Sequence, residues 1–116
     1  MTPDHARAFA AEWVAAWNAH DLERILSHYA EDVVFLSPIA QKRVGNGRVV
    51  GKAALRAYWG PALTALSDLH FDSIEVFTGF DALTVLYESR GRGRVTETFE
   101  FGADGKVVRS AACYAG

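Results

Sequence analysis

The first part of the chain repeats its apolar positions with the period of an α-helix. Over residues 4–19, Phe9, Trp13 and Trp17 recur four residues apart and would share one helical face. Asp21 is a favourable N-cap for a second, shorter helix. The apolar stripe of that second helix would consist of Leu22, Ile25, Leu26 and Tyr29.

A third helix is expected over residues 52–66 and a loop or ragged hairpin over residues 39–50, around Gly45-Asn46-Gly47. Proline lacks an N–H and clashes with the preceding helical turn. We therefore expect Gly60-Pro61 to kink this helix or to split it in two.

Alternation of apolar and polar residues with a period of two predicts the strands. They should cover residues 32–37, 70–78, 82–91, 94–102 and 106–115. Pro38 should end the first strand, because proline cannot donate to a sheet ladder. Short turns join the last four strands, which predicts an antiparallel meander. Helices followed by strands indicate an α+β fold with the helices packed on one sheet face.

Length and composition are typical of one globular domain, here residues 1–116. Half of the residues are hydrophobic, which suits a protein with a core. The formal net charge of −2 gives no general attraction to phosphate backbones, so nucleic-acid binding is not expected. Cys113 is the single cysteine, which excludes an intrachain disulfide and a multi-cysteine zinc site. No His-Glu-x-x-His occurs either, and we expect neither a metal nor a cofactor.

The cellular compartment is predicted from two features of the sequence. The first residues show no secretory signal, and no apolar run approaches the ~20 residues that span a bilayer. We therefore expect a cytoplasmic protein without a membrane partner.

Glu97 is out of place on its strand. Alternation puts it on the same face as Val95, Phe99 and Phe101, where a carboxylate would lose hydration and its pKa would rise. A carboxyl group with a raised pKa can donate a hydrogen bond, or act as acid and base near neutral pH. The alternative is that Glu97 lies at a sheet end and pairs with an arginine such as Arg90 or Arg94.

Neighbouring strands would extend the two faces of the sheet. The face of Glu97 would also carry Leu83, Val85, Tyr87, Ser89, Val108, Ser110, Ala112 and Tyr114. The opposite face would carry Leu86, Val107, Ala111 and Cys113. That second face is apolar for a surface in contact with water, and it predicts a homodimer through the outer face of the sheet.

Four short sequence segments, considered together with their order and spacing, span nearly the whole length of the chain. They are WNAHDL at 17–22, YAEDVVF at 29–35, VGKAALRAYW at 50–59 and FEFGADGKVV at 99–108. In these segments the chain resembles the nuclear transport factor 2-like superfamily, which includes ketosteroid isomerases and SnoaL-like polyketide cyclases. The resemblance implies a cone-like, curved antiparallel (mixed) sheet packed on three helices from the N-terminal half, enclosing a pocket.

The resemblance also implies a role for Glu97, which falls where ketosteroid isomerases place a protonated acid. Two other positions depart from the isomerase pattern. Ser37, before Pro38, stands where the isomerases have their base, and Trp13 stands where they have an oxyanion-binding tyrosine. A serine without a partner is not basic, and an indole can only donate. True steroid isomerisation is therefore not expected. The resemblance to SnoaL-like cyclases implies instead a mechanism in which a single pocket carboxylate, here Glu97, moves the proton.

Two functions stay open. In the first, Glu97 moves a proton on an apolar carbonyl or polyketide-like compound, as a cofactor-free isomerase, cyclase or dehydratase. In the second, the chain is a non-catalytic ligand-binding or dimerisation module of the same fold. In either case the expected partner is a small apolar or aromatic molecule. The predicted ligand-binding residues are Trp13, Trp17, Phe35, Ser37, Tyr58, Val85, Tyr87, Phe99, Ser110 and Tyr114.

Overall fold

A computed structural model describes residues 1–116 and contains four helices and six strands. The helices are α1 (Pro3–Asn18), α2 (Leu22–Leu26), α3 (Pro38–Val44) and α4 (Lys52–Ala65). The strands are β1 (Tyr29–Leu36), β2 (Arg48–Val50), β3 (Phe71–Gly79), β4 (Ala82–Ser89), β5 (Gly93–Phe101) and β6 (Val107–Tyr114). The predicted α+β class is confirmed.

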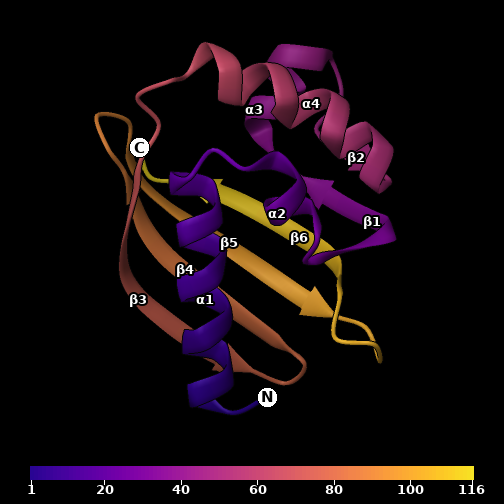
Figure 1. Ribbon diagram of the computed structural model, residues 1–116, viewed down its shortest axis with the longest axis vertical. Helices are drawn as coiled ribbons and strands as arrows, with labels where there is room; N and C mark the ends of the chain where they lie inside the picture. Colours follow the sequence, from indigo (N-terminus) through magenta and orange to yellow (C-terminus); the bar gives the residue numbers. More distant parts are fainter.

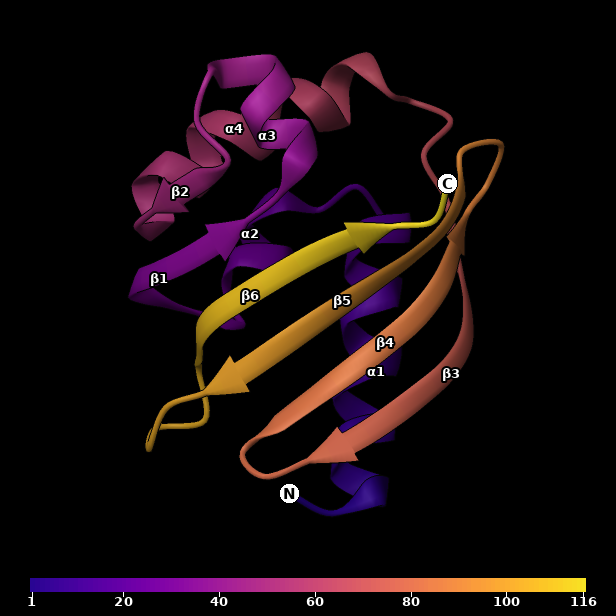
Figure 2. The same ribbon diagram turned by 180° about the vertical axis from the view of Figure 1, so that it is seen from behind.

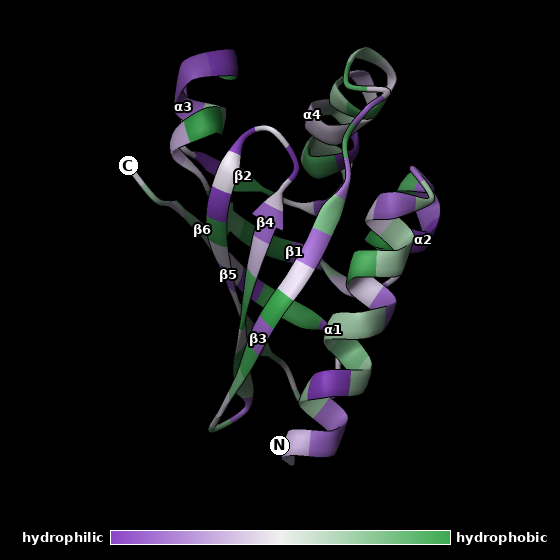
Figure 3. Ribbon diagram, turned by 90° about the vertical axis from the view of Figure 1, so that its left-hand side faces the viewer, coloured by the Kyte–Doolittle hydropathy of each residue, from purple (hydrophilic) through white to green (hydrophobic).

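The strands form one open sheet in the order β2-β1-β6-β5-β4-β3, and α1 lies across one of its faces (Figure 1). The last four strands are the predicted antiparallel meander. β1 pairs in parallel with β6 and antiparallel with β2, so the sheet is mixed. Seen from the side, α1 and α2 stand against the same face of the sheet (Figure 3). The opposite face is not covered by any helix (Figure 2).

The end of α1 is tied to the start of β3 by one side chain. Asn18 Nδ2 donates a hydrogen bond to the carbonyl oxygen of Phe71 at 3.0 Å, and Asn18 Oδ1 accepts one from the Phe71 N–H at 2.7 Å. The buried face of α1 consists of Ala6, Ala10, Trp13, Ala16 and Trp17. The helix thus presents its tryptophans to the sheet beside a fixed Phe71.

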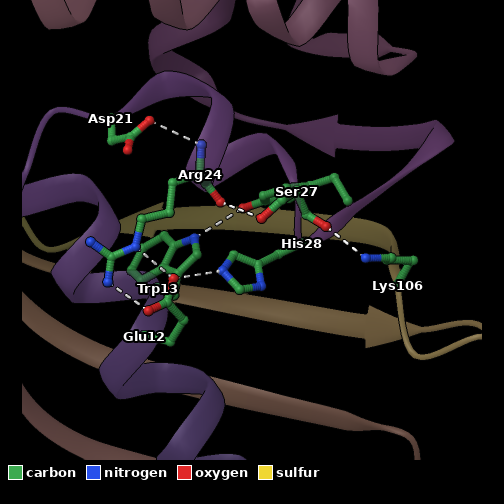
Figure 4. Close-up of polar contacts among 8 residues, drawn as sticks. Glu12, Trp13, Asp21, Arg24, Ser27, His28 and Lys106 are labelled. Carbon is green, nitrogen blue, oxygen red and sulfur yellow. Dashed lines mark hydrogen bonds and ion pairs between the residues drawn. The ribbon is translucent and has the colours of Figure 1, made fainter.

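A carboxylate on α1 fastens this helix to the α2 region. Figure 4 shows Arg24 and His28 converging on Glu12. The Arg24 guanidinium donates to both Glu12 oxygens, at 2.6 and 2.9 Å, and His28 Nε2 lies 3.2 Å from Oε2. These hydrogen bonds, chiefly those from Arg24, lower the pKa of Glu12 to about 2.

The region between β1 and α4 differs from the prediction. Instead of a loop or ragged hairpin over residues 39–50, it forms α3 and the short strand β2. Ser37 is the N-cap of α3, and its Oγ accepts from the N–H groups of Ile39 at 3.1 Å and Ala40 at 3.4 Å. Pro38 follows at the first helical position, where its missing N–H carries no penalty. Gly45 ends the helix with φ of 78°, a left-handed conformation that suits glycine.

The fourth helix continues through Pro61, so of the kink or split expected at Gly60-Pro61 the split does not occur. Proline removes one hydrogen bond, but the helix buries Leu55 and Trp59 before Pro61 and Leu63 after it. Burial on both sides of the proline offsets the missing bond.

An irregularity in the pairing of β5 and β6 exchanges the sheet faces that were predicted for Val107 and Val108. Phe101 pairs with Val107 and Glu100 pairs with Arg109, which leaves Val108 unpaired at this bulge. Val107 is therefore fully buried in the core, whereas Val108 is 36% exposed. The prediction that Val107 faces outwards and Val108 inwards is wrong.

None of the helices is long and apolar enough to cross a membrane.

Candidate ligand-binding site

Glu97 lies in the middle of β5, between Val85 of β4 and Ala112 of β6. Only 3% of the residue is exposed, and its Oε2 atom has no hydrogen-bond partner. The alternative ion pair does not form, because Arg90 binds Asp72 at 3.1 Å instead and no ion pair joins Arg94 to Glu97. The inward orientation that alternation predicted is confirmed.

The environment of Glu97 favours its neutral form. Burial removes water from the carboxyl group and raises its pKa from 4.5 to about 8. At pH 7, one unit below this pKa, most Glu97 side chains are therefore protonated and about one in ten is ionised. The same burial raises the pKa values of Tyr29 and Tyr87 well above their ordinary value, and proximity to Glu97 adds to both shifts.

A cavity of about 370 Å³ opens beside Glu97. Residues from both layers of the fold contribute to its wall. They are Trp13, Trp17, Phe35, Ile39, Arg43, Tyr58, Trp59, Ala62, Leu66, Leu69, Phe71, Tyr87, Ser89, Arg92, Val95, Glu97, Ala112 and Tyr114. The volume and the mainly apolar lining are typical of small-molecule sites.

Aromatic rings in contact make the wall rigid. Trp17 meets Trp59 edge to face at a centroid distance of 5.1 Å. Phe71 packs on Tyr87 at 4.4 Å and stacks on Trp13 at 5.7 Å. Such ring pairs add stability beyond the area they bury, so the shape of the cavity is largely preformed.

Seven residues that the sequence singled out line this cavity. They are Glu97 together with Trp13, Trp17, Phe35, Tyr58, Tyr87 and Tyr114. Tyr114, at the end of β6, is 44% exposed and marks the mouth of the cavity.

Four other predicted ligand-binding residues do not line the cavity. Val85 and Phe99 are fully buried in the core, and Phe99 packs edge to face on Trp13. Ser110 is also in the core, with an unpartnered hydroxyl group. The side-chain oxygen of Ser37 accepts the N-cap hydrogen bonds of α3. Alternation assigns a residue to a face, but it does not say where along that face the helices have filled the space.

The two tryptophans of α1 differ in whether their N–H groups have an acceptor. Trp13 Nε1 donates to the hydroxyl oxygen of Tyr29 at 3.0 Å, so its single donor is used inside the core. Trp17 is 7% exposed, lines the cavity, and its Nε1 has no partner. The free donor therefore comes from the last turn of α1.

Two arginines in the wall were not predicted as site residues. Arg92, in the turn between β4 and β5, binds Asp68 at 3.1 Å. Arg43, in the last turn of α3, lines the cavity beside Ile39 and has no ion-pair partner. Had a helix been recognised over residues 38–44, the spacing of four between Ile39 and Arg43 would have placed both on one face.

The structure contains no cluster of three or more His, Cys, Asp or Glu side chains that could hold a metal ion.

The sequence matches the model of a known protein family. The model of the SnoaL-like domain matches residues 10–110. Among solved structures, a SnoaL-like protein of unknown function from Burkholderia thailandensis is 43% identical. It superposes with a TM-score of 0.95 over 99% of this chain and 98% of that one.

Two further relatives have more specific names. The epoxide hydrolase LasB of Streptomyces lasalocidi is 30% identical over 111 residues, which is 84% of this chain and 37% of that protein. This chain therefore spans little more than a third of that relative. TerC, crystallised with polyporic acid, is 22% identical, with a TM-score of 0.73 over 91% of this chain and 88% of that one. At that identity the likeness to TerC shows the fold alone.

Proposed function

We propose that this chain, which belongs to the SnoaL-like domain family, binds a small apolar or aromatic molecule beside Glu97 and moves a proton on it. One observation carries the proposal: a buried carboxyl group without a protein partner faces an aromatic-lined cavity of about 370 Å³. No cofactor is needed for this chemistry.

Glu97 suits proton transfer in both directions. With a pKa of about 8, the carboxyl group exists in both protonation states near neutral pH. On an apolar carbonyl or polyketide-like compound, the ionised form takes a proton from the carbon next to the carbonyl. The electrons of the broken C–H bond move to the carbonyl oxygen as an enolate, and the protonated form returns a proton to carbon.

Two relatives support the choice of ligand. LasB is an epoxide hydrolase, and an epoxide oxygen, like a carbonyl oxygen, can receive a proton from a neutral carboxylic acid. TerC was crystallised with polyporic acid, which is consistent with a fold that holds small organic molecules.

Hydrogen exchange tests the catalytic part of the proposal. In D2O, the protein should accelerate deuterium uptake next to the carbonyl of 2-tetralone, measured by proton NMR, with a rate that levels off above a pH of about 8. Glu97→Gln should abolish the acceleration while leaving quenching of tryptophan fluorescence by the ketone intact. Glu100→Gln removes an exposed carboxylate from the same strand and is the matched control. Undiminished exchange in Glu97→Gln would refute the assignment.

A second candidate is a binding module without chemistry, and specific contacts favour it. At the two positions where isomerases have further catalytic groups, Ser37 caps α3 and Trp13 donates to Tyr29. The Trp13 indole therefore has no donor left for a reaction, and the Ser37 oxygen already accepts two hydrogen bonds. Binding of 2-tetralone without accelerated exchange would favour this candidate over the first.

We also propose that the uncovered face of the sheet binds a second copy of the chain (Figure 2). Phe77 is 49% exposed there, opposite Thr84, and Cys113 and Val108 are also exposed. Sedimentation velocity should report a dimer, and Phe77→Lys should shift it towards monomer. A wild-type monomer would overturn this assignment. The cytoplasmic location stays a prediction from the sequence.

A further inference from the structure

The ionisable side chains in the wall of the cavity include more basic than acidic groups. Glu97 is the only acidic residue in the wall, and burial favours its neutral form. Arg43 and Arg92 are the basic residues there. The cavity therefore has two guanidinium groups at its exposed side, of which Arg92 is paired with Asp68, and a carboxyl group that is mostly neutral near neutral pH.

Arg43 is the arginine whose charge is available. Most arginines of the chain are engaged in ion pairs, namely Arg7, Arg24, Arg56, Arg90, Arg92 and Arg109. Arg43 has no such pair, yet it lines the cavity, whereas the unpaired Arg48 and Arg94 do not.

Two phenols share the region of Arg43. Burial raises the pKa of Tyr114 to about 12 and raises the pKa of Tyr58, while hydrogen bonding to Ser37 and, to a lesser degree, the positive charge of Arg43 oppose both shifts. Both hydroxyl groups therefore stay protonated near neutral pH. The mouth of the cavity thus combines a guanidinium with two neutral phenols, a set of donors suited to a negatively charged oxygen.

Deeper in the cavity, Trp17 provides an independent sign of a ligand. A buried N–H group without an acceptor costs about 1–3 kcal/mol, so such groups are rare unless something else satisfies them. Trp17 Nε1 is such a group, and it belongs to a residue that lines the cavity. An oxygen atom of a bound molecule would satisfy it.

We infer that the molecule bound in this cavity is an organic anion, with an aromatic or polyketide-like body between the tryptophans and a carboxylate or enolate oxygen held by Arg43. A second oxygen accepts the hydrogen bond of Trp17. This inference rests on the proposed function and narrows its ligand class. The neutral form of Glu97, which predominates near neutral pH, should bind the anion more tightly than the ionised form, because an ionised carboxylate repels it.

A pair of probes that differ in charge tests the inference. 2-Naphthoate and 2-naphthamide have nearly the same shape, and either bicyclic molecule is small enough for about 370 Å³. Quenching of tryptophan fluorescence reports binding, because Trp13, Trp17 and Trp59 all line the cavity. Near pH 7, naphthoate should bind about tenfold more tightly than the amide, the ratio expected for one charge-assisted contact.

Matched variants then locate the charge. Arg43→Gln should remove most of the preference for naphthoate while leaving the affinity for naphthamide unchanged. Arg48→Gln removes an unpaired, exposed arginine outside the cavity and should keep the preference. Trp17→Phe should weaken the binding of both probes.

The outcomes separate this inference from the proposed function. Equal affinity for the two probes, or a preference that survives Arg43→Gln, overturns the anion inference, while the exchange of 2-tetralone can still succeed. Failure of both probes to bind overturns the anion inference and the proposed pocket function together.

Discussion

Replacing Glu97 with glutamine removes a group that folding forces into its neutral form. The pKa of this carboxyl is about 8 in the folded protein, against an ordinary value of 4.5. Below 4.5 both states are protonated, and the group has no effect on stability. Between 4.5 and about 8 the unfolded chain releases a proton that the folded chain keeps, so stability falls as pH rises. Above about 8 both states are ionised, and the loss levels off.

The size of the effect follows from the width of this pH window. Each pH unit inside it lowers the free energy of unfolding by about 1.4 kcal/mol. From pH 5 to pH 8 wild-type protein should therefore lose about 4 kcal/mol through Glu97 alone. Glutamine does not titrate, so the stability of Glu97→Gln relative to wild type should rise by the same amount.

Urea unfolding, followed by tryptophan fluorescence at several pH values between about 5 and 8, measures this difference. Groups that titrate alike in both proteins cancel in the comparison. The profile of Glu100→Gln corrects for the loss of one exposed carboxylate from the same strand. A difference between Glu97→Gln and wild type that stays constant with pH would refute the argument, because it would mean that the folded state leaves the carboxyl hydrated.

Three further substitutions test contacts that shape the site, each by urea unfolding. Asn18→Ala removes both hydrogen bonds to the Phe71 backbone and should lower the free energy of unfolding by about 2 kcal/mol. A decrease of less than about 0.5 kcal/mol would show that water replaces them. Tyr29→Phe leaves the Trp13 N–H buried without an acceptor and should cost about 1–3 kcal/mol, and an unchanged stability would contradict the buried hydrogen bond. Gly45→Ala should cost about 1 kcal/mol from the positive φ alone, since nothing lies within 4 Å of the added carbon; a stabilising effect would contradict the left-handed cap.

The sequence alone determined the parts of this protein that depend on local periodicity. The tryptophan-bearing face of α1, the meander of β3 to β6 and the inward side of Glu97 could all be predicted. Each follows from the fixed geometry of helices and strands, in which spacing along the chain decides the direction of a side chain. The resemblance to a known superfamily added the curved sheet and the pocket, which periodicity cannot supply.

Only the tertiary structure decided which groups meet at the site. The bulge that buries Val107 depends on how β6 pairs with β5, and the parallel pairing with β1 joins segments far apart in sequence. Trp13 and Trp17 are equivalent in spacing, yet the hydroxyl group of Tyr29 takes the donor of the first and leaves that of the second free. Arg43 reaches the cavity because Ser37 starts a helix within an expected loop. A hydrogen bond needs two partners, and where the second partner comes from a distant segment, only the packed fold determines which donors remain for a ligand.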